Sequence, residues 1–402
     1  MVKFSIFMPT YNRQELFTKT LDSLLAQTYD NFELFLVDNG SVPSVGGIVT
    51  QINDPRIIYR RFDENIDLTP VVEDYLSIMT GSHFLFIGDD DALTPNALDI
   101  VASIFKQNKD IELFSVGYAK FNHVIKKGNV DITFDDIQEF TGKEIVLGFC
   151  SSWGIGPQKI FDGPRKAHPS ASFISRALIE RTRQHQKQLF IRPFGDVGYL
   201  GCCLYTPKVY YLDLPLTIVG DALDRDSQNM GAGRRKNLEQ GAVFLEYSPL
   251  RGITFANLAV ESHLKVLYRN KLDKIYDCRL RPKFYYRHLR QVISDNPWTW
   301  ITIRDIAECI CPFIISMIKY LTIKELAGKI ILMSKAVNRI KAATSNERID
   351  NLKSKELADS MKEDDRNTEE LLFEDINHFA RWVEMNYIKP RLRTSNGEKL
   401  SS

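Results

Sequence analysis

The sequence predicts an α/β fold in which a mainly parallel sheet is covered by helices. Over the first 120 residues, short apolar runs typical of strands alternate with amphipathic stretches typical of helices. Polar clusters follow three of the predicted strands, where ligands bind in such sheets. The predicted strands are Phe4–Met8, Phe32–Val37, Ile57–Tyr59, Phe84–Gly88 and Ile111–Val116.

Three helices are predicted between these strands. The stretch Arg13–Ala26 places its leucines and Phe17 on one helical face, and Asp67–Met79 has a helical pattern. The stretch Pro95–Phe105 opens with a proline, which favours the first turn of a helix. These alternating elements predict a sheet with helices packed on it.

Size and composition bound the function classes. The 402 residues suggest about two or three domains. The net charge of +1 argues against a nucleic-acid partner, and six cysteines without zinc or disulfide spacing fit a reducing compartment. The N-terminus shows no signal peptide, and the longest apolar run, Cys309–Met317, is too short to span a bilayer. We therefore expect a cytoplasmic location.

The pattern predicts three regions. Residues 1–237 form the α/β domain, with halves 1–120 and 121–237. Residues 238–345 are mostly helical and basic, since 265–341 carry 16 Lys and Arg against six Asp and Glu. Residues 346–402 are a charged tail with a final helix near 369–387.

The three polar clusters are the candidate functional residues. They are Pro9-Thr10-Tyr11-Asn12-Arg13, Asp38-Asn39-Gly40-Ser41 and Gly88-Asp89-Asp90-Asp91. Because parallel strands end at the same edge of a sheet, we expect the three clusters to lie together there.

The aspartate triplet is the most informative cluster. Three adjacent carboxylates after a buried strand repel one another, which raises their pKa values or requires a cation. Mg²⁺ and Mn²⁺ take oxygen ligands, and Mg²⁺ commonly bridges a carboxylate to substrate phosphates. The alternative is a solvated acidic turn, the interpretation given to Glu363-Asp364-Asp365 in the tail.

Four motifs in order resemble the family 2 glycosyltransferases of GT-A fold. They are PTYNR, VDNGS, the Asn-rich turn Glu64–Asp67, and TGSHFLFIGDDDAL, and the match covers residues 3–120 and more loosely extends to about 220. GDDD after an aromatic strand is most similar to the abequosyltransferase-like branch of surface-polysaccharide enzymes. The expected fold is therefore GT-A, a Rossmann-like sheet, with a helical C-terminal extension.

The resemblance implies roles for matching residues. Residues 1–120 become the nucleotide-sugar half and 121–237 the acceptor half. Asp91 binds a divalent cation (Mn²⁺ or Mg²⁺), and Asp89 contacts the ribose or the metal and its water. The nucleotide contacts are expected from Thr10, Tyr11, Arg13, Asp38, Asn39, Asn65, Asp67, Asp89 and Asp90. UDP is the default donor nucleotide, but Asn39 replaces an aspartate of many relatives and leaves the base open.

Several of these residues have structural alternatives. Asn12 and Asn65 also suit caps or turns, and Asp38 suits the cap of a helix after Pro43.

Inverting relatives use a carboxylate base about a hundred residues beyond the aspartates. Asp196 in Arg192–Leu200 stands at that distance, although it also suits a helix N-cap. Arg234 or Arg235 is a candidate for stabilising the leaving group, against an ordinary solvated loop. Relatives often carry a metal-ligating histidine in this region, but this chain has none between His185 and His263. The resemblance therefore implies that the metal either relies on Asp91, phosphates and water or recruits Asp221 or Asp224.

The expected reaction moves a sugar from a nucleotide diphosphate sugar to a hydroxyl of a glycan or lipid-linked acceptor, with inversion. The alternative is a non-catalytic sugar-nucleotide-binding or scaffold protein of the same fold. A nucleotidyltransferase is disfavoured because PTYNR offers no Gly-rich phosphate loop.

Residues 298–341 combine tryptophans, an apolar face and off-face lysines. This pattern fits a segment at the inner face of the plasma membrane. It fits equally a helical subdomain that packs on the catalytic domain or forms a homo-oligomer.

Overall fold

The chain is described by a computed structural model. The described residues are 1–130, 137–152, 155, 168–191, 199–221, 246–248, 250, 255–274, 278–295, 309–310, 312–316 and 372–395.

The chain divides into two compact units. One comprises Met1–Cys278 with Leu372–Ser402, and the other comprises Arg279–Leu371. The boundaries predicted after residues 237 and 345 lie outside the described residues and stay predictions. Helix α9 (Phe255–Arg269) and the end of the chain fall in the same unit as the sheet.

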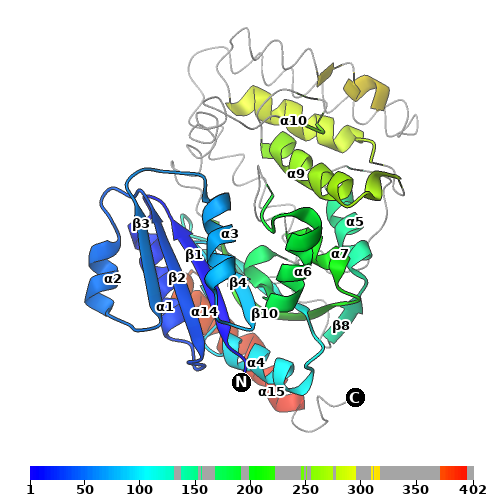
Figure 1. Ribbon diagram of the computed structural model, residues 1–402. Helices are drawn as coiled ribbons and strands as arrows, with labels where there is room; N and C mark the ends of the chain where they lie inside the picture. The colour runs from blue at the N-terminus through cyan, green and yellow to red at the C-terminus, as the bar shows by residue number, and fades with distance from the viewer. Residues whose placement is uncertain are drawn as a thin grey trace. The chain divides into compact units, whose positions relative to one another are not determined.

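The first unit is built on a mixed sheet (Figure 1). Strands β3, β2, β1 and β4 are parallel, β9 is antiparallel between β4 and β6, and β10 runs parallel to β6. The strands are β1 (Phe4–Thr10), β2 (Phe32–Asn39), β3 (Ile57–Phe62), β4 (His83–Phe86), β5 (Ala92–Leu93), β6 (Leu113–Asn122), β7 (Lys127–Asn129), β8 (Ile137–Phe140), β9 (Ser172–Ser175) and β10 (Val209–Asp221).

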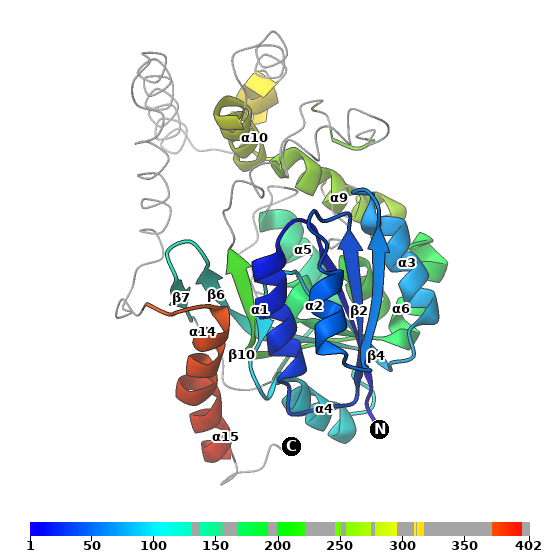
Figure 2. The same cartoon turned by 90° about the vertical axis from the view of Figure 1, so that its left-hand side faces the viewer.

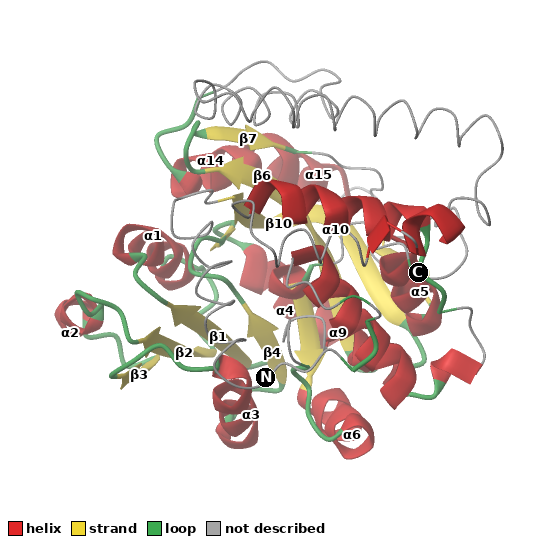
Figure 3. Ribbon diagram, turned by 90° about the horizontal axis from the view of Figure 1, so that it is seen from above, coloured by secondary structure: helices red, strands yellow, loops and turns green. Residues whose placement is uncertain are grey.

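Helices cover both faces of this sheet (Figure 3). On one face α1 and α4 bury Leu21 and Val101, and on the other Tyr75 of α3 packs on Phe7 and Phe35. Because successive side chains of a strand point to opposite faces of the sheet, one strand can provide apolar side chains to both layers of helices. The helices of this unit are α1 (Gln14–Leu25), α2 (Gly46–Ile52), α3 (Leu68–Ile78), α4 (Ala97–Gln107), α5 (Gly142–Ser152), α6 (Arg176–Gln186), α7 (Tyr199–Tyr205), α9, α14 (Ile376–Val383), the π-helix η4 (Glu384–Ile388) and α15 (Lys389–Ser395), with 3₁₀ turns at Pro169–Ala171 and Leu272–Lys274.

The five predicted strands and three predicted helices are confirmed, with shifted ends. The second unit includes α10 (Pro282–Asp295). Among the described residues, none of the helices combines the length and hydropathy needed to cross a bilayer. Most of residues 298–341 lie outside the described residues, so the membrane and oligomer hypotheses for this segment stay predictions.

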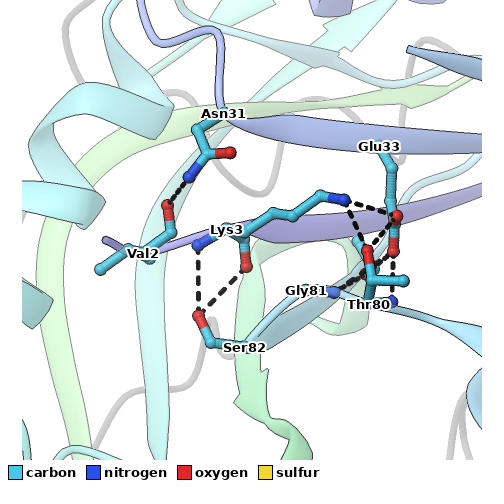
Figure 4. Close-up of polar contacts among 8 residues, drawn as sticks. Val2, Lys3, Asn31, Glu33, Thr80, Gly81 and Ser82 are labelled. Carbon is cyan, nitrogen blue, oxygen red and sulfur yellow. Dashed lines mark hydrogen bonds and ion pairs between the residues drawn. The ribbon is translucent and has the colours of Figure 1, made fainter.

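A buried carboxylate ties the strands together at the edge opposite the aspartates (Figure 4). Glu33 of β2 accepts hydrogen bonds from the side chains of Lys3, Ser5 and Thr80, and from the amides of Thr80 and Gly81. Burial alone would raise the pKa of Glu33, but the bonds from Ser5, Thr80 and Lys3 outweigh it and hold the pKa at about 2. The ionised carboxylate therefore stabilises the folded chain.

Replacing Glu33 by glutamine is expected to lower the free energy of unfolding at pH 7 by about 2–3 kcal/mol. Because the folded pKa is depressed, the contribution is present above the ordinary glutamate pKa of 4.5 and is lost as pH falls toward about 2. The unfolding free energies of wild type and Glu33→Gln, measured with denaturant, should therefore converge as the pH falls from 7 to 2. Glu180→Gln, at an exposed position on α6, is the control. Parallel curves for wild type and Glu33→Gln would contradict the assignment.

Candidate active site

The three polar clusters lie together at the carboxyl edge of β1, β2 and β4, as expected. Thr10 at the end of β1 pairs in register with Asp38 at the end of β2. The residues that follow β4, Gly88–Asp91, form what we call the aspartate loop. Thr10 Oγ1 donates a hydrogen bond to Asp89 Oδ2 at 2.7 Å, so the first and third clusters are in direct contact.

Asp89 is held by the first cluster. Arg13 Nη1 lies 3.1 Å from Asp89 Oδ1 and 3.3 Å from Asp90 Oδ2. Arg13 sits there because it directly precedes α1, and its side chain is mostly buried. Burial raises the pKa of Asp89, and Arg13 and Thr10 only partly offset this effect. The carboxylate is therefore oriented but not fully neutralised.

Asp91 is oriented by two backbone amides. Its Oδ2 accepts from Gly88 N and its Oδ1 from Gly220 N, both at 3.0 Å. Thr20 of α1 donates to the backbone carbonyl of Asp91 at 2.7 Å. Asp91 is 4% exposed, so these contacts fix a carboxylate that is nearly removed from solvent.

Asp90 completes the loop, with a histidine that the sequence reasoning missed. Burial, and then the neighbouring carboxylates of Asp91 and Asp89, raise the pKa of Asp90 well above its usual value. Nε2 of His123, just beyond β6, lies 2.8 Å from the carbonyl oxygen of Asp90. A carbonyl only accepts, so Nε2 carries a proton, and burial holds the pKa of His123 below its usual value. No sequence spacing signals this pairing.

Two glycines make room for the loop. A Cβ at Gly220 would lie 1.9 Å from the carbonyl oxygen of Asp90 and 2.6 Å from His123 Nε2. A Cβ at Gly88 would lie 3.0 Å from carboxylate oxygens of both Asp90 and Asp91. These two oxygens therefore approach the same point on the Gly88 backbone, and β10 can close on the loop only because residue 220 is glycine.

The donor set suits a hard divalent cation. Carboxylates are crowded together, and the pKa values of Asp89 and Asp90 are raised, so a positive ion would stabilise the charged forms. Within the described ranges, no group of three His, Cys, Asp or Glu side chains forms a metal site from protein donors alone. A cation here would need further oxygens, of the kind that a diphosphate and water supply.

Asp38 is a loop organiser in this structure. It is fully buried and accepts hydrogen bonds from the amides of Ser41 and Val45 and from the hydroxyls of Ser44 and Tyr59. Burial would raise its pKa, but these bonds lower it overall. Asp38 is not the N-cap of α2, because Val45 occupies that position without a side-chain cap, but its contacts hold the loop that leads into this helix.

Asn39 clasps the turn that contains Asn65. Its Nδ2 donates to the carbonyl of Ile66 at 2.9 Å and to Asn65 Oδ1 at 3.2 Å, while its Oδ1 accepts from Ile66 N. Asn65 and Asp67 are both exposed. Asp67 caps α3 by accepting a hydrogen bond from Thr69 N. Gly40 is required below this turn, because its φ is +85° and a Cβ would lie 2.5 Å from the backbone of Glu64.

Replacing Asn39 by aspartate is expected to release this turn, because a carboxylate would face the oxygens of Ile66 and Asn65 with no proton to donate. We expect a loss of about 1–3 kcal/mol in unfolding free energy, as for an unsatisfied buried group. We also expect weaker nucleotide binding, measured by calorimetry. Asn129→Asp on exposed β7 is the control. Wild-type stability with tighter nucleotide binding would instead make residue 39 a reader of the base.

The first cluster also contributes an exposed aromatic ring. Tyr11 is 40% exposed at this edge, beside buried Thr10. Asn12 adopts a positive φ of 54°, its amide donates to Ser41 Oγ, and its Oδ1 accepts from Val42 N. Asn12 thus links the first cluster to the second and serves the turn role foreseen for it.

Several predicted residues lie outside the described residues: Asp196, Asp224, Arg234 and Arg235. Asp221, the other candidate ligand, ends β10 and accepts a hydrogen bond from Asn122 Nδ2 at 3.4 Å. It lies close enough to His123 to act on its charge, on the β10 side of the aspartate loop.

Comparison with known proteins places this arrangement in a family. Residues 5–162 match the family model described as glycosyl transferase family 2. This part of the chain is a family 2 glycosyltransferase domain. With its mainly parallel sheet and flanking helices, it has the GT-A fold. The sequence resemblance to this family is confirmed, whereas the abequosyltransferase-like branch is not singled out.

Curated relatives of this glycosyltransferase domain share parts of the chain. The putative colanic acid biosynthesis glycosyl transferase WcaA of Escherichia coli is 35% identical over 31% of this chain and 44% of its own length. Glycosyltransferase GlyA of Streptococcus pneumoniae is 27% identical over 53% of this chain and 30% of its own length. The chain thus spans less than half of these two proteins.

A third relative is matched over more of its length. It is the GalNAc(5)-diNAcBac-PP-undecaprenol β-1,3-glucosyltransferase of Campylobacter jejuni, which is 26% identical over 58% of this chain and 69% of its own length. Among solved structures, residues 1–349 of S. aureus TarS with UDP-GlcNAc align at 14% identity and a TM-score of 0.44, over 77% of this chain and 89% of that one.

Proposed function

We propose that the chain is a metal-dependent, inverting glycosyltransferase that moves a sugar from a nucleoside diphosphate sugar to a hydroxyl of a glycan or lipid-linked acceptor. The observation that carries this proposal is the aspartate loop, whose buried carboxylates are oriented by Thr10, Arg13 and the Gly88 and Gly220 amides within a family 2 domain. A non-catalytic sugar-nucleotide-binding protein would use the same carboxylates, so nucleotide release, and not binding, separates it from this proposal.

The proposal gives the described residues distinct tasks. Asp91 and Asp89 would hold the cation, with Asp90 beside them. The bound cation neutralises the charge that develops on the departing diphosphate. Arg13 orients Asp89, while exposed Tyr11 and the turn around Asn65 offer contacts to the nucleotide. Asp38 and Asn39 would position the loops that face the donor and would not contact it themselves, because their polar atoms already bind those loops.

A second carboxylate supplies the base. Attack by a hydroxyl on the anomeric carbon requires removal of its proton as the new bond forms. We assign this proton transfer to Asp196, on the resemblance noted above. With the base on the acceptor and the diphosphate leaving from the opposite face, the transfer inverts the configuration at the anomeric carbon.

UDP is the proposed donor nucleotide, and the acceptor class follows two relatives, one named for colanic acid biosynthesis and one for transfer to a PP-undecaprenol-linked glycan. The test is a panel of UDP-, dTDP-, CDP- and GDP-sugars incubated with the protein, Mn²⁺ and candidate acceptors, with nucleotide release followed by chromatography. Release from UDP-sugars, abolished by a chelator, is the expected result. Binding of sugar nucleotides with no release under any condition would favour the non-catalytic alternative.

A membrane contact at the inner face of the plasma membrane is proposed for residues 298–341, on their basic amphipathic pattern. Replacing Lys324, Lys329 and Lys335 by glutamine is expected to lower the affinity for anionic vesicles in co-sedimentation by about a hundredfold, because each basic residue near such a surface contributes about 1 kcal/mol. Neutral vesicles are the control. Undiminished binding of the triple variant, with unchanged oligomeric state on light scattering, would contradict this role.

A further inference from the structure

The end of the chain packs behind the aspartate loop. The segment Leu372–Leu392, which we call the return segment, contains α14 and lies beside β6, β7 and β10 (Figure 2). Ile376, Phe379 and Val383 of α14 are fully buried in the main core. The sequence pattern indicated a helix here but gave no reason to place it against the catalytic unit.

The first connection runs through the β6–β7 hairpin. Phe373 N donates to the carbonyl of Lys126, and Leu372 forms a bridge with Lys127. The Phe379 ring fills the space over Gly128, where a Cβ would lie 2.2 Å from it.

The same ring continues toward the aspartates. Phe379 stacks on Phe121 at 5.7 Å between centroids, and Phe121 meets the ring of His123 edge-on at 5.1 Å. His123 then donates to the carbonyl of Asp90. A shift of α14 would therefore reach the aspartate loop through two ring contacts and one hydrogen bond.

The second connection runs through α1. Asp375 Oδ2 lies 2.8 Å from Lys19 Nζ, and Asn377 Nδ2 donates to the carbonyl of Lys19 at 2.9 Å. The next residue, Thr20, donates to the carbonyl of Asp91. The return segment thus contacts α1, whose Thr20 binds the carbonyl of Asp91, and β6, which leads to the His123 that binds the carbonyl of Asp90.

We infer that the return segment is a positioning element of the active site, which fixes the aspartate loop through His123 on one side and Thr20 on the other. Carboxylates that share a cation with a diphosphate must be held within about 0.5 Å, and the position of the backbone at Asp90 and Asp91 determines where their carboxylates lie. The kinetic consequences rest on the proposed function, whereas the mechanical coupling does not.

The test compares three variants of the full chain by hydrogen–deuterium exchange. Phe379→Leu weakens the first connection, and Asp375→Asn weakens the second while leaving an oxygen to cap α14 through His378 N. Phe4→Leu is the control, because Phe4 is equally buried but packs on Tyr29 and Phe173. Concentrations of denaturant are chosen so that the global stabilities of the four proteins match.

Exchange of the amides in residues 88–94 is expected to rise about tenfold in Phe379→Leu and severalfold in Asp375→Asn, but not in Phe4→Leu. Equal exchange in Phe379→Leu and Phe4→Leu would overturn the inference.

Sugar transfer supplies a second readout. The two return-segment variants should need several times more Mn²⁺ for half-maximal rate and should lose about tenfold in kcat/KM. A wild-type chain that transfers no sugar would refute the proposed function, while the exchange data would still decide the role of the return segment.

Discussion

Replacing Asp91 by asparagine is expected to lower kcat/KM for the donor by about a thousandfold, the loss typical of removing a group that stabilises developing charge. The amide has no negative charge to bind a cation. Its NH₂ group would also replace one of the two accepting oxygens and so place two hydrogen-bond donors against each other, at the N–H of Gly88 or of Gly220. The measurement is nucleotide release at saturating Mn²⁺.

The control for this variant is Asp99→Asn, which removes a carboxylate in the exposed first turn of α4. It should retain full activity. A Tm of Asp91→Asn within a few degrees of wild type would exclude unfolding as the cause. Activity of Asp91→Asn within tenfold of wild type would contradict a metal-binding role for this carboxylate.

The second large effect is expected at Asp196. Asp196→Asn should lower kcat by about a thousandfold, within the range for loss of a general base, and leave the Kd for the donor unchanged. The separation of kcat from donor binding distinguishes a base from a helix cap, because a lost cap would change stability and binding together. Single-turnover transfer and donor calorimetry on the same preparation are the measurements.

Asp99→Asn again serves as the control for Asp196→Asn. Retained transfer, or a loss of donor binding equal to the loss of rate, would show that Asp196 is not the base.

Local sequence patterns predicted the first half of the fold well. Strands such as β1 and β2 are mostly apolar runs of the kind buried in a parallel sheet, and α1 has a clear amphipathic face. Strand β9 was not predicted, because its four residues, Ser172–Ser175, pair with β4 and β6 through contacts distant in sequence. The packing of the return segment could not be predicted either, since an amphipathic pattern indicates a helix but not the surface against which the helix packs.

The candidate site was predicted in outline only. Strand ends in a parallel sheet converge, so the contact between Thr10 and Asp89 followed from topology. His123 and Gly220 join the aspartate loop across 33 and 129 residues, which no local pattern reveals. The sequence likewise does not reveal the direction of the Asn39 side-chain amide, which donates to the carbonyl of Ile66.

The central claim is that the aspartate loop holds a divalent cation, which in turn holds a diphosphate. Calorimetric titration of UDP into the wild-type chain, with Mn²⁺ and then with excess chelator, tests it most directly. We expect binding with Mn²⁺ that weakens at least about tenfold on chelation, and the same weak binding for Asp91→Asn under both conditions. Equal UDP affinity with and without the metal, unchanged in Asp91→Asn, would contradict it.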